Sequence, residues 1–338
     1  MKALALYSGG LDSTLAIKII AQQGIEVIAV HFLTPFSKAK KEDIERLTKK
    51  VKEALGVELK AIYLGSEFLE IIKNPKFGYG KNLNPCIDCK ILMLRHTKKL
   101  MQELGASFII TGEVMGQRPK SQHKDTLRVI EKQAGLEGLL LRPLSAKLLF
   151  ATIAETNGWV KRDQLFGFNG RSRLPQMKLA ESLGIKEYAN PAGGCLLTIS
   201  SFCVRVEDLL MYNELTCDNV ALLLLGRHFR LSSLSKLVVG KDEKQNALLL
   251  GLAKPDDIIF EPKVLPGPTG LGRGIFDQAA KLAASQIIAH YTSSAAKEVE
   301  IVLKVFPQQE EILSVGGINV NRLRELMIQV KEEVYENS

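Results

Sequence analysis

The chain has 338 residues, more than a single hydrophobic core usually supports, so we expect two domains. Its hydrophobic residues, 46% of the total, fall into runs far shorter than the roughly twenty needed to span a bilayer, which excludes a membrane protein. No secretory h-region follows Met1, and a cytoplasmic location is expected. The 45 Lys and Arg against 37 Asp and Glu give a formal charge of +8, which favours a polyanionic partner such as RNA.

In the first 115 residues, short apolar runs alternate with amphipathic stretches. This pattern is typical of a parallel sheet wrapped by helices. Strands are expected at Ala3–Tyr7, Glu26–Phe32, Glu58–Leu64 and Ser107–Ile110, and helices at Thr14–Gln23, Lys41–Leu55 and Ile91–Leu104. The polar residues 116–123 then predict a loop or flexible flap. After it we expect a helix at Thr126–Gln133, a strand at Gly138–Leu141, a helix at Leu174–Leu183 and an irregular loop at 190–194.

The sequence changes character after about residue 205. Helices are expected at Val204–Tyr212 and Ile275–Tyr291, and strands at Lys236–Val239, Ala247–Leu252 and Glu298–Val305. We therefore predict a parallel-sheet α/β domain over residues 1–205 and an α+β domain over residues 206–338.

A glycine-containing loop lies between the first predicted strand and the first predicted helix. Its residues are Ser8, Gly9, Gly10, Leu11, Asp12 and Ser13. Backbone N–H groups at such a junction can converge on an anion, while Asp12 could orient the loop or help to hold Mg²⁺. The alternative is an ordinary strand-to-helix turn with an Asp or Ser cap.

This loop resembles the SGGxDS motif of the PP-loop ATP-pyrophosphatases at every defined position. It does not resemble the GxxxxGK[ST] loop of other nucleotide triphosphatases, because no lysine follows the glycines. The resemblance implies an adenine-nucleotide-binding domain in which the loop grips the pyrophosphate end of ATP, with Thr111 and Gly112 as further contacts. It leaves the substrate open, since amide-forming ligases and tRNA sulfurtransferases share the motif.

Three of the five cysteines lie in loop-like surroundings. Cys86 and Cys89 precede a predicted helix, whose N-terminus is expected to lower the thiol pKa, and Cys195 follows Gly193 and Gly194. An odd number of cysteines in a cytosolic chain favours metal or redox chemistry over a disulfide framework. The simpler alternatives are a structural zinc half-site or thiols without a function. Cys203 and Cys217 are expected to be core residues.

Together with the phosphate loop, these cysteines make residues 1–200 similar to the tRNA thiouridine synthetases, particularly the 2-thiouridylases. The segments that fit are 84–89 (NPCIDC), 141–145 (LRPLS) and 193–195 (GGC). Members without a cluster use two cysteines, matching Cys89 and Cys195, and have Asp where Cys86 stands. The third thiol therefore points to the branch in which Cys86, Cys89 and Cys195 hold a [4Fe–4S] cluster with one iron open. A persulfide relay between Cys89 and Cys195 and a zinc site completed by a histidine such as His96 are the alternatives.

The carboxyl-terminal region resembles the NFACT-R type of RNA-binding domain. The likeness rests on residues 238–246 (VVGKDEKQN) and 266–270 (PGPTG), and it spans about residues 220–305. It implies that basic side chains contact RNA phosphates: Arg227, Arg230, Lys241, Lys244 and Arg273. The alternative is a generic α+β domain with glycine turns.

The resemblances together imply ATP-dependent thiolation of a tRNA uridine. The uridine carbonyl oxygen attacks ATP, and sulfur then displaces AMP, with Asp12, Cys89 and Cys195 as catalytic residues. The implied cofactors are ATP, Mg²⁺ and the [4Fe–4S] cluster, and the implied partners are tRNA, a sulfur donor (sulfide or a persulfide carrier) and a second copy in a homodimer. The rivals are an amide- or nitrile-forming ligase that uses ammonia and a non-catalytic RNA-binding protein. The first would carry zinc-binding cysteines near the carboxyl end, and the intact loop and cysteines argue against the second.

Overall fold

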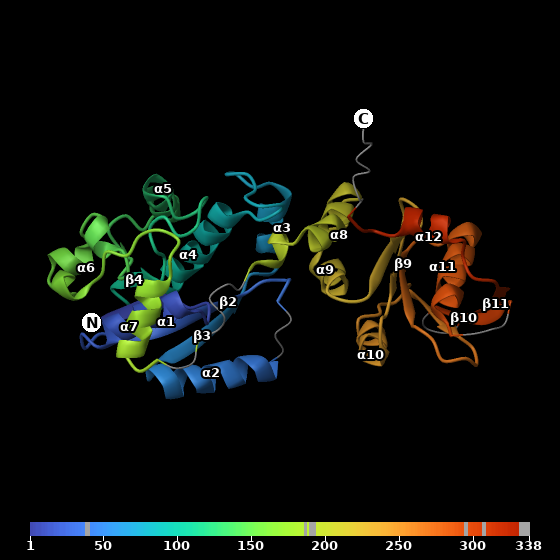
Figure 1. Ribbon diagram of the computed structural model, residues 1–338, viewed down its shortest axis with the longest axis horizontal. Coiled ribbons are helices and arrows are strands. Elements are labelled where there is room, and N and C mark those ends of the chain that lie inside the picture. Colours follow the sequence, from blue (N-terminus) through green and yellow to red (C-terminus); the bar gives the residue numbers. More distant parts are fainter. Residues whose placement is uncertain (38–40, 186–187, 189–193, 294–296, 306–308, 331–338) are drawn as a thin grey trace. The chain divides into compact units, whose positions relative to one another are not determined.

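A computed structural model describes residues 1–37, 41–185, 188, 194–293, 297–305 and 309–330. The chain divides into two compact units, the amino-terminal unit Met1–Thr198 and the carboxyl-terminal unit Ile199–Ser338 (Figure 1). Within these ranges, every helix is too short or too polar to cross a membrane. Of the irregular loop predicted at 190–194, only Gly194 is among the described residues.

The amino-terminal unit alternates strands and helices along the chain. Its strands are β1 (Lys2–Leu6), β2 (Glu26–Leu33), β3 (Glu58–Tyr63), β4 (Phe108–Thr111) and β5 (Leu140–Leu141). Its α-helices are α1 (Leu11–Ala21), α2 (Lys41–Leu55), α3 (Gly65–Lys73), α4 (Cys86–Glu103), α5 (Lys124–Ala134), α6 (Ile153–Thr156) and α7 (Leu174–Ser182). The sheet is parallel, in the order β3-β2-β1-β4-β5. The predicted parallel α/β fold is confirmed.

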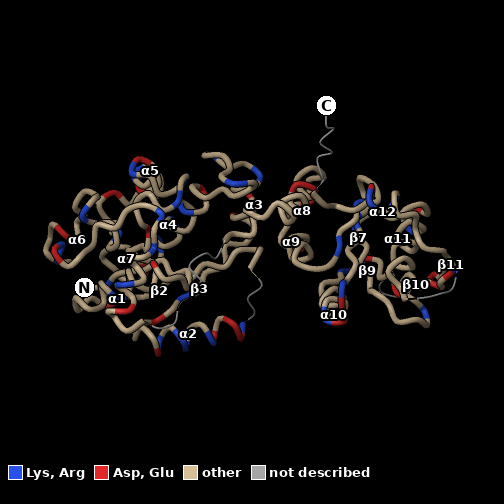
Figure 2. Tube along the Cα trace, in the orientation of Figure 1, with Lys and Arg blue, Asp and Glu red and all other residues tan. Residues whose placement is uncertain are grey.

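Alternation along β1 creates the two buried faces of this sheet. Ala3 and Ala5 join a hydrophobic cluster with residues of α1, α2 and α7, whereas Leu4 and Leu6 join a second cluster with residues of α4 and α5. Successive strand residues point to opposite faces, so a continuous apolar run is what a sheet covered on both sides requires. Helix α2 fully buries only Val51 and carries interspersed acidic and basic residues on its surface (Figure 2).

The strand order of this sheet reverses between β1 and β4. The chain proceeds from β1 toward β2 and β3 on one side, and through β4 to β5 on the other, so the order reverses at this point. In open α/β sheets, ligands bind outside the carboxyl ends of the strands at such a point. Helix α4 runs back from the carboxyl edge of the sheet to the start of β4, so its first residue, Cys86, lies at this same edge.

The carboxyl-terminal unit is built on an antiparallel sheet. Its strands are β6 (Arg227–Arg230), β7 (Ser235–Val239), β8 (Ile258–Pro262), β9 (Gly270–Gly274), β10 (Val299–Val305) and β11 (Gln309–Val315), in the order β11-β10-β8-β9-β7-β6. Its helices are α8 (Ser200–Met211), α9 (Cys217–Leu223), α10 (Glu243–Gly251), α11 (Gln278–Tyr291) and α12 (Val320–Leu326). Leu237 and Val239 face a cluster with α11 and α12, while Val238 faces α9 and α10. The predicted α+β class is confirmed.

Two expectations for this unit are wrong. Ala247–Leu252, predicted as a strand, lies mostly in α10, where the Asp242 side chain accepts a hydrogen bond from the Gln245 N–H at 2.9 Å and caps the helix. A short apolar run cannot by itself distinguish a strand from a helix, and leucine is a strong helix former. Cys217, predicted to be a core residue, is the half-buried first residue of α9, whereas Cys203 is buried as expected.

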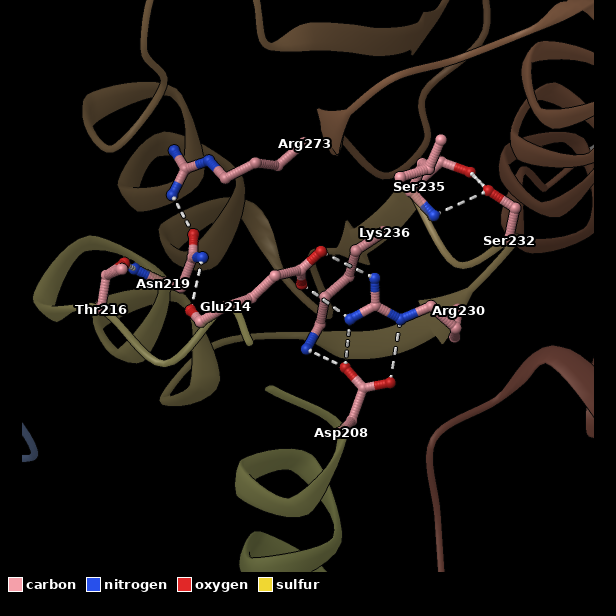
Figure 3. A network of polar contacts seen from close by, with 10 residues as sticks. Asp208, Glu214, Thr216, Asn219, Arg230, Ser232, Ser235, Lys236 and Arg273 are labelled. Atoms are coloured by element: carbon pink, nitrogen blue, oxygen red, sulfur yellow. Dashed lines mark hydrogen bonds and ion pairs between the residues drawn. The ribbon is translucent and has the colours of Figure 1, made fainter. Parts of the chain in front are cut away.

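Ion pairs hold α8 in the carboxyl-terminal unit. Asp208 accepts hydrogen bonds from Arg230 Nη2 at 2.6 Å and Lys236 Nζ at 2.8 Å, and Glu214 accepts a further one from Arg230 (Figure 3). The predicted boundary at 205/206 therefore falls inside a helix that is bound to β6 and β7, and the units divide between Thr198 and Ile199 instead.

The outer edge of β6 is paired by the chain itself. Met327 forms an antiparallel bridge with Phe229, and the Ile328 N–H donates to the His228 carbonyl at 2.9 Å. The opposite edge of the same sheet is formed by β11.

Candidate nucleotide and thiol site

The glycine loop joins β1 to α1 without an intervening linker. Gly9 has φ +78°, a left-handed conformation that favours glycine, and Gly10 is the N-cap of α1. The Gly10 carbonyl accepts hydrogen bonds from Ser13 Oγ at 2.9 Å and Thr14 Oγ1 at 3.1 Å. No side chain caps the first turn of α1 in this described segment, so its first N–H groups are available to an anion. This geometry argues against an ordinary capped turn.

Asp12 has one carboxylate oxygen that is not satisfied. Its Oδ2 accepts a hydrogen bond from Gln117 Nε2 at 3.1 Å, whereas Oδ1 is buried and has no hydrogen-bond partner among the described residues. Burial raises the pKa of Asp12, while the Gln117 hydrogen bond and the positive charges of Arg173 and Arg118 act against this rise. A buried carboxylate oxygen without a donor is suited to a cation.

Thr111 and Gly112 lie beside the glycine loop, as β1 and β4 pair through Leu6 and Thr111. A Cβ atom at Gly112 would lie 2.4 Å from the Asp12 carbonyl carbon and 2.5 Å from the Ser13 nitrogen, so only glycine fits here. The Thr111 hydroxyl donates to Glu113 Oε2 at 3.0 Å. Gly112 thus allows the end of β4 to pack directly against the loop.

Glu113 is a buried charge that the sequence interpretation missed. Its carboxylate lies 3.1 Å from Arg142 Nε and 3.8 Å from Lys90 Nζ. Burial by itself would raise the pKa of Glu113, but Lys90 and Arg142 lower it below its usual value. A Glu two residues after a buried strand and an isolated Arg in an apolar run were the available sequence signals. The ion pairs connect the ends of β4 and β5 to the residue after Cys89.

Cys86 and Cys89 occupy the first turn of α4. Cys86 Sγ donates to Asn84 Oδ1 at 3.0 Å, and Asp88 accepts the backbone N–H groups of residues 76 and 77 at 3.1 Å each. Burial raises the pKa of Cys86 and raises that of Cys89 to about 12, although Lys90 acts in the opposite direction. The expectation that the helix N-terminus lowers these pKa values is wrong, because the loss of hydration outweighs the nearby positive charges.

Cys195 lies near the other two cysteines, although more than a hundred residues separate them in sequence. Negative charge on Cys195 and on Cys86 would contribute to the raised pKa of Cys89, so each of these thiols lies within electrostatic range of Cys89. Thr198 donates its backbone N–H to the Cys195 carbonyl at 2.9 Å, and Asn82 Nδ2 donates to the Thr198 carbonyl at 2.9 Å. This turn is thereby connected to the residues before the CxxC pair. The preceding Gly193 lies outside the described residues.

No three His, Cys, Asp or Glu side chains in the described ranges are placed to hold a single metal ion. The zinc alternative with His96 also conflicts with helix geometry. His96 lies seven residues beyond Cys89 on α4, roughly 10 Å along the helix axis, whereas zinc–ligand bonds are about 2 Å. Its Nε2 is 2.5 Å from Glu67 Oε2 instead. His96 therefore cannot complete a zinc site with Cys89.

Residues 116–122 connect the glycine loop to the segment that precedes the CxxC pair. Gln117 binds Asp12, while Lys120 Nζ donates to the carbonyl of Gly78 at 3.0 Å and to that of Tyr79. The positive charges of Arg118 and Lys120 act to lower the pKa of Cys86. The predicted loop is present, and hydrogen bonds at both ends of the site hold it in place.

Two of the predicted RNA contacts in the carboxyl-terminal unit are occupied internally. Arg230 is paired with Asp208 and Glu214 (Figure 3). Arg273 Nη2 lies 2.6 Å from Asp257 Oδ2. These two guanidinium groups fix α8 and the loop before β8. Their predicted role as phosphate contacts is therefore wrong.

The remaining three candidates, Arg227, Lys241 and Lys244, have no carboxylate within ion-pair distance in the described part of the chain. Arg227 lies over the Tyr291 ring at 4.5 Å from its centroid. Asn246 Oδ1 accepts the Thr269 N–H at 3.1 Å, so the two motif segments of this unit meet near these cations.

Family comparisons match each unit separately. Residues 1–147 match the family described as thiamine biosynthesis protein (ThiI), and residues 226–327 match the NFACT protein RNA binding domain. The amino-terminal unit carries a ThiI-like PP-loop domain, and the carboxyl-terminal unit carries an NFACT-type domain. The ThiI-like match contains the glycine loop, Cys86, Cys89 and Gly112, but ends before Cys195.

Two curated relatives each match part of this chain. A probable tRNA sulfurtransferase of Thermococcus kodakarensis is 28% identical over 152 residues, which are 42% of this chain and 36% of the relative. A tRNA-specific 2-thiouridylase MnmA of Sulfurimonas denitrificans is 30% identical over 115 residues, 33% of this chain and 34% of the relative. The chain thus spans about a third of the length of these curated relatives.

Among solved structures, a 4-thiouridine synthetase in complex with RNA and ATP shares 28% identity over 42% of this chain and 36% of its own, with a TM-score of 0.34. A TM-score this low does not establish a shared fold.

Proposed function

We propose that this protein is an ATP-dependent tRNA sulfurtransferase that activates a uridine as an adenylate and replaces its carbonyl oxygen with sulfur. The observation that carries the proposal is an uncapped glycine loop that residues 116–122 link to the segment before Cys86: Gln117 donates to Asp12, and Lys120 donates to the Gly78 carbonyl. The match of residues 1–147 to the ThiI family and the tRNA sulfurtransferases among the relatives support it.

In the first step, the uridine carbonyl oxygen attacks the α-phosphorus of ATP, and pyrophosphate leaves. The N–H groups of the first turn of α1 would bind the pyrophosphate end, with the hydroxyls of Ser8 and Ser13 beside them. The residues fit Mg²⁺ as well, because Asp12 Oδ1 is buried without a partner and could bind a cation that neutralises the leaving group. Gly9, Gly10, Leu11 and Gly112 would keep the backbone close to the phosphates, with Thr111 next to them.

In the second step, sulfur attacks the activated carbon, and AMP leaves with the original oxygen. Covalent activation divides one difficult substitution into two easier ones. Three thiols suit a [4Fe–4S] cluster, whose cysteines bind different irons and need not converge on one ion, and Cys86, Cys89 and Cys195 would hold it. When bound, such a cluster supplies an iron that can take external sulfide. In the persulfide relay, Cys89 and Cys195 carry the sulfur themselves.

We further propose that the carboxyl-terminal unit binds the tRNA. Its match to the NFACT RNA-binding domain and the cations Arg227, Lys241 and Lys244 support this assignment. The sulfur donor and the homodimer stay predictions.

The decisive experiment measures pyrophosphate release and thiouridine formation in the same reaction. The full chain should release pyrophosphate only with tRNA present, and Cys89→Ser should still do so while forming no thiouridine. Release that needs ammonia instead of sulfide would select the amide-forming alternative, and no release at all would select the non-catalytic one.

Anaerobic iron and sulfide analysis separates the two sulfur routes. A cluster predicts about four irons and four sulfides per chain, lost in alanine variants at Cys86, Cys89 or Cys195. Full thiolation by Cys86→Ala, without iron, would select the persulfide relay.

A further inference from the structure

The amino-terminal unit contains a hollow whose lining residues differ from the glycine loop and the cysteines of the proposed catalytic site. It has a volume of about 440 Å³ and lies between α5, β5 and residues 146–155. Neither the glycine loop nor any of the three cysteines lines it. Its size falls in the range of about 300–1,000 Å³ that is usual for a small organic group.

Phe150 forms an exposed aromatic surface at this hollow. Its side chain is 72% exposed, the highest value among the large hydrophobic residues of the amino-terminal unit that the structure describes. The Lys124 ammonium lies 5.8 Å and the Arg128 guanidinium 5.4 Å from the ring centroid. An isolated exposed Phe needs no explanation, but a hollow with two cations over one aromatic ring has the features of a stacking site for an anionic, planar ligand.

The charge at this hollow is positive once internal pairs are considered. Lys124, Arg128 and Lys132 line it, and none has a carboxylate within ion-pair distance in the described ranges. Two of its three acidic residues are already neutralised, because Glu131 binds Arg142 at 3.0 Å and Glu155 binds Arg162. Glu137 is the remaining acid. A protein segment with apolar side chains would leave three cations without counter-charge, whereas a phosphate-bearing ligand would pair with them.

Hydrogen bonds fix the segment that carries Phe150. Arg162 Nη2 donates to the Leu149 carbonyl at 2.9 Å, and the Ile153 N–H donates to the Gly138 carbonyl at 2.8 Å. Between them, Thr152 and Glu155 form a capping box at the start of α6. The ring is therefore displayed on a preorganised backbone, which reduces the entropy lost when a ligand binds.

We propose that this hollow binds one unpaired nucleotide of the tRNA, with its base stacked on Phe150 and its phosphates against Lys124 and Arg128. The inference rests on the proposed function, since it takes tRNA as the substrate. Single-stranded nucleotides are held by the same combination of an aromatic platform and cations along the backbone. The hollow thus gives the catalytic unit an RNA contact of its own, in addition to the carboxyl-terminal unit.

The test uses the full chain and measures tRNA binding over a range of salt concentrations. Phe150→Ala should weaken binding by about tenfold or more, and Phe150→Trp should retain it, because base stacking depends on the ring. Changing Lys124 and Arg128 to Gln should lower the slope of log K against log salt by about two. Tyr63→Ala, an exposed aromatic of β3 that does not line the hollow, is the matched control and should bind like the wild type.

Two outcomes distinguish this proposal from the proposed function. A wild-type chain that binds no tRNA removes the proposed function. Wild-type binding that is unchanged, in affinity and salt slope, in Phe150→Ala and in the double glutamine variant overturns the nucleotide site alone. A photo-crosslinking amino acid at position 150 should capture an unpaired nucleotide, and capture of a second protein chain in its place would also overturn it.

Discussion

The two units use their charged residues in different ways. In the amino-terminal unit, Glu113 and Arg142 are paired, but polar groups after β1 are left with unused capacity: the first N–H groups of α1 and Asp12 Oδ1. In the carboxyl-terminal unit, the most buried charges are paired with one another, as Asp208 with Arg230 and Lys236. Unused polar capacity at a strand end indicates a ligand, whereas an ion pair between elements indicates support for the fold.

The largest expected effect tests the distinction between residues that bind a ligand and residues that support the fold. It compares two glycines of the amino-terminal unit. Gly112→Ala places a methyl group 2.4 Å from the Asp12 backbone, so we expect a loss of about 3 kcal/mol in stability and at least about a hundredfold in ATP affinity. The Gly10→Val protein should keep the wild-type melting temperature and lose only ATP binding. The reason is that a Cβ atom at position 10 would have no neighbour closer than Ser8 Oγ at 3.5 Å. Calorimetry with and without ATP measures both quantities. A Gly112→Ala protein with wild-type ATP affinity would contradict the packing argument.

Removing Asp208 should mainly destabilise the carboxyl-terminal unit. Asp208→Ala leaves Arg230 and Lys236 without their shared partner, and we expect a loss of about 3 kcal/mol. Hydrogen exchange should become faster in α8, β6 and β7. The single Trp of the chain, Trp159, stacks on Phe108 in the other unit and provides the control, since its unfolding transition should not move.

The same carboxylate predicts an acid sensitivity. Burial would raise the pKa of Asp208, but hydrogen bonds from Arg230 and Lys236 lower it overall. A folded pKa below the unfolded value of about 3.9 stabilises the protein above that pH, and this contribution is lost as the pH falls through the folded pKa. Exchange in α8 should therefore accelerate below about pH 4 in the wild type, with a weaker pH dependence in Asp208→Asn. Equal pH dependence in both proteins would assign the acid sensitivity to other groups.

Lysines without an ion-pair partner should contribute to RNA binding through charge alone. Changing Lys241 and Lys244 to Gln should lower the salt slope of tRNA binding by about one per residue, with little change in melting temperature. Arg273→Gln is the contrasting variant, because its guanidinium is bound to Asp257 and its loss should reduce stability first. If the lysine variants retain the wild-type salt dependence of tRNA binding, these lysines do not contribute to RNA binding.

The smallest expected effect concerns the turn that carries Cys195. Asn82 has φ +53°, a conformation that glycine accepts, so Asn82→Gly removes the hydrogen bond to Thr198 without straining the backbone. Thiolation should fall by about fivefold, the equivalent of one hydrogen bond of about 1 kcal/mol, and tRNA-dependent pyrophosphate release should not change. An equal fall in both activities would mean that Asn82 supports the site as a whole.

The amino-terminal fold was predictable because its local patterns agree with its tertiary environment. The apolar run of β1 is buried on both faces of the sheet. The glycine loop after it has a sequence that is specific to this type of loop. Ala247–Leu252 was not predictable, since the same leucines fit a strand or a helix until the Asp242 cap decides between them. The division between the units escaped prediction for a related reason, because the partners of Asp208 lie on strands twenty or more residues later.

For the site, sequence identified the residue types but not their environments. The motif predicted Asp12 and the cysteines, yet the raised pKa of Cys89 results from burial, which motif spacing does not reveal. Gln117, Glu113 and Asn82 were missed because each acts through a partner distant in sequence. The predicted roles of Arg230 and Arg273 as RNA contacts were wrong for the same reason. The sequence of a motif does not indicate which carboxylate pairs with a basic residue in it.

The bridge between Met327 and Phe229 also concerns the solubility of the chain. An unpaired outer strand offers a row of N–H and C=O groups to which another chain can add, a common start of aggregation. Residues 327–328 occupy that position along β6, while the strand at the other edge, β11, carries the exposed Glu310, whose charge opposes pairing with a strand of another chain. A chain that ends at Leu326 should therefore associate through β6 and scatter more light than the full chain at equal concentration. Equal scattering would show that β6 needs no such cover.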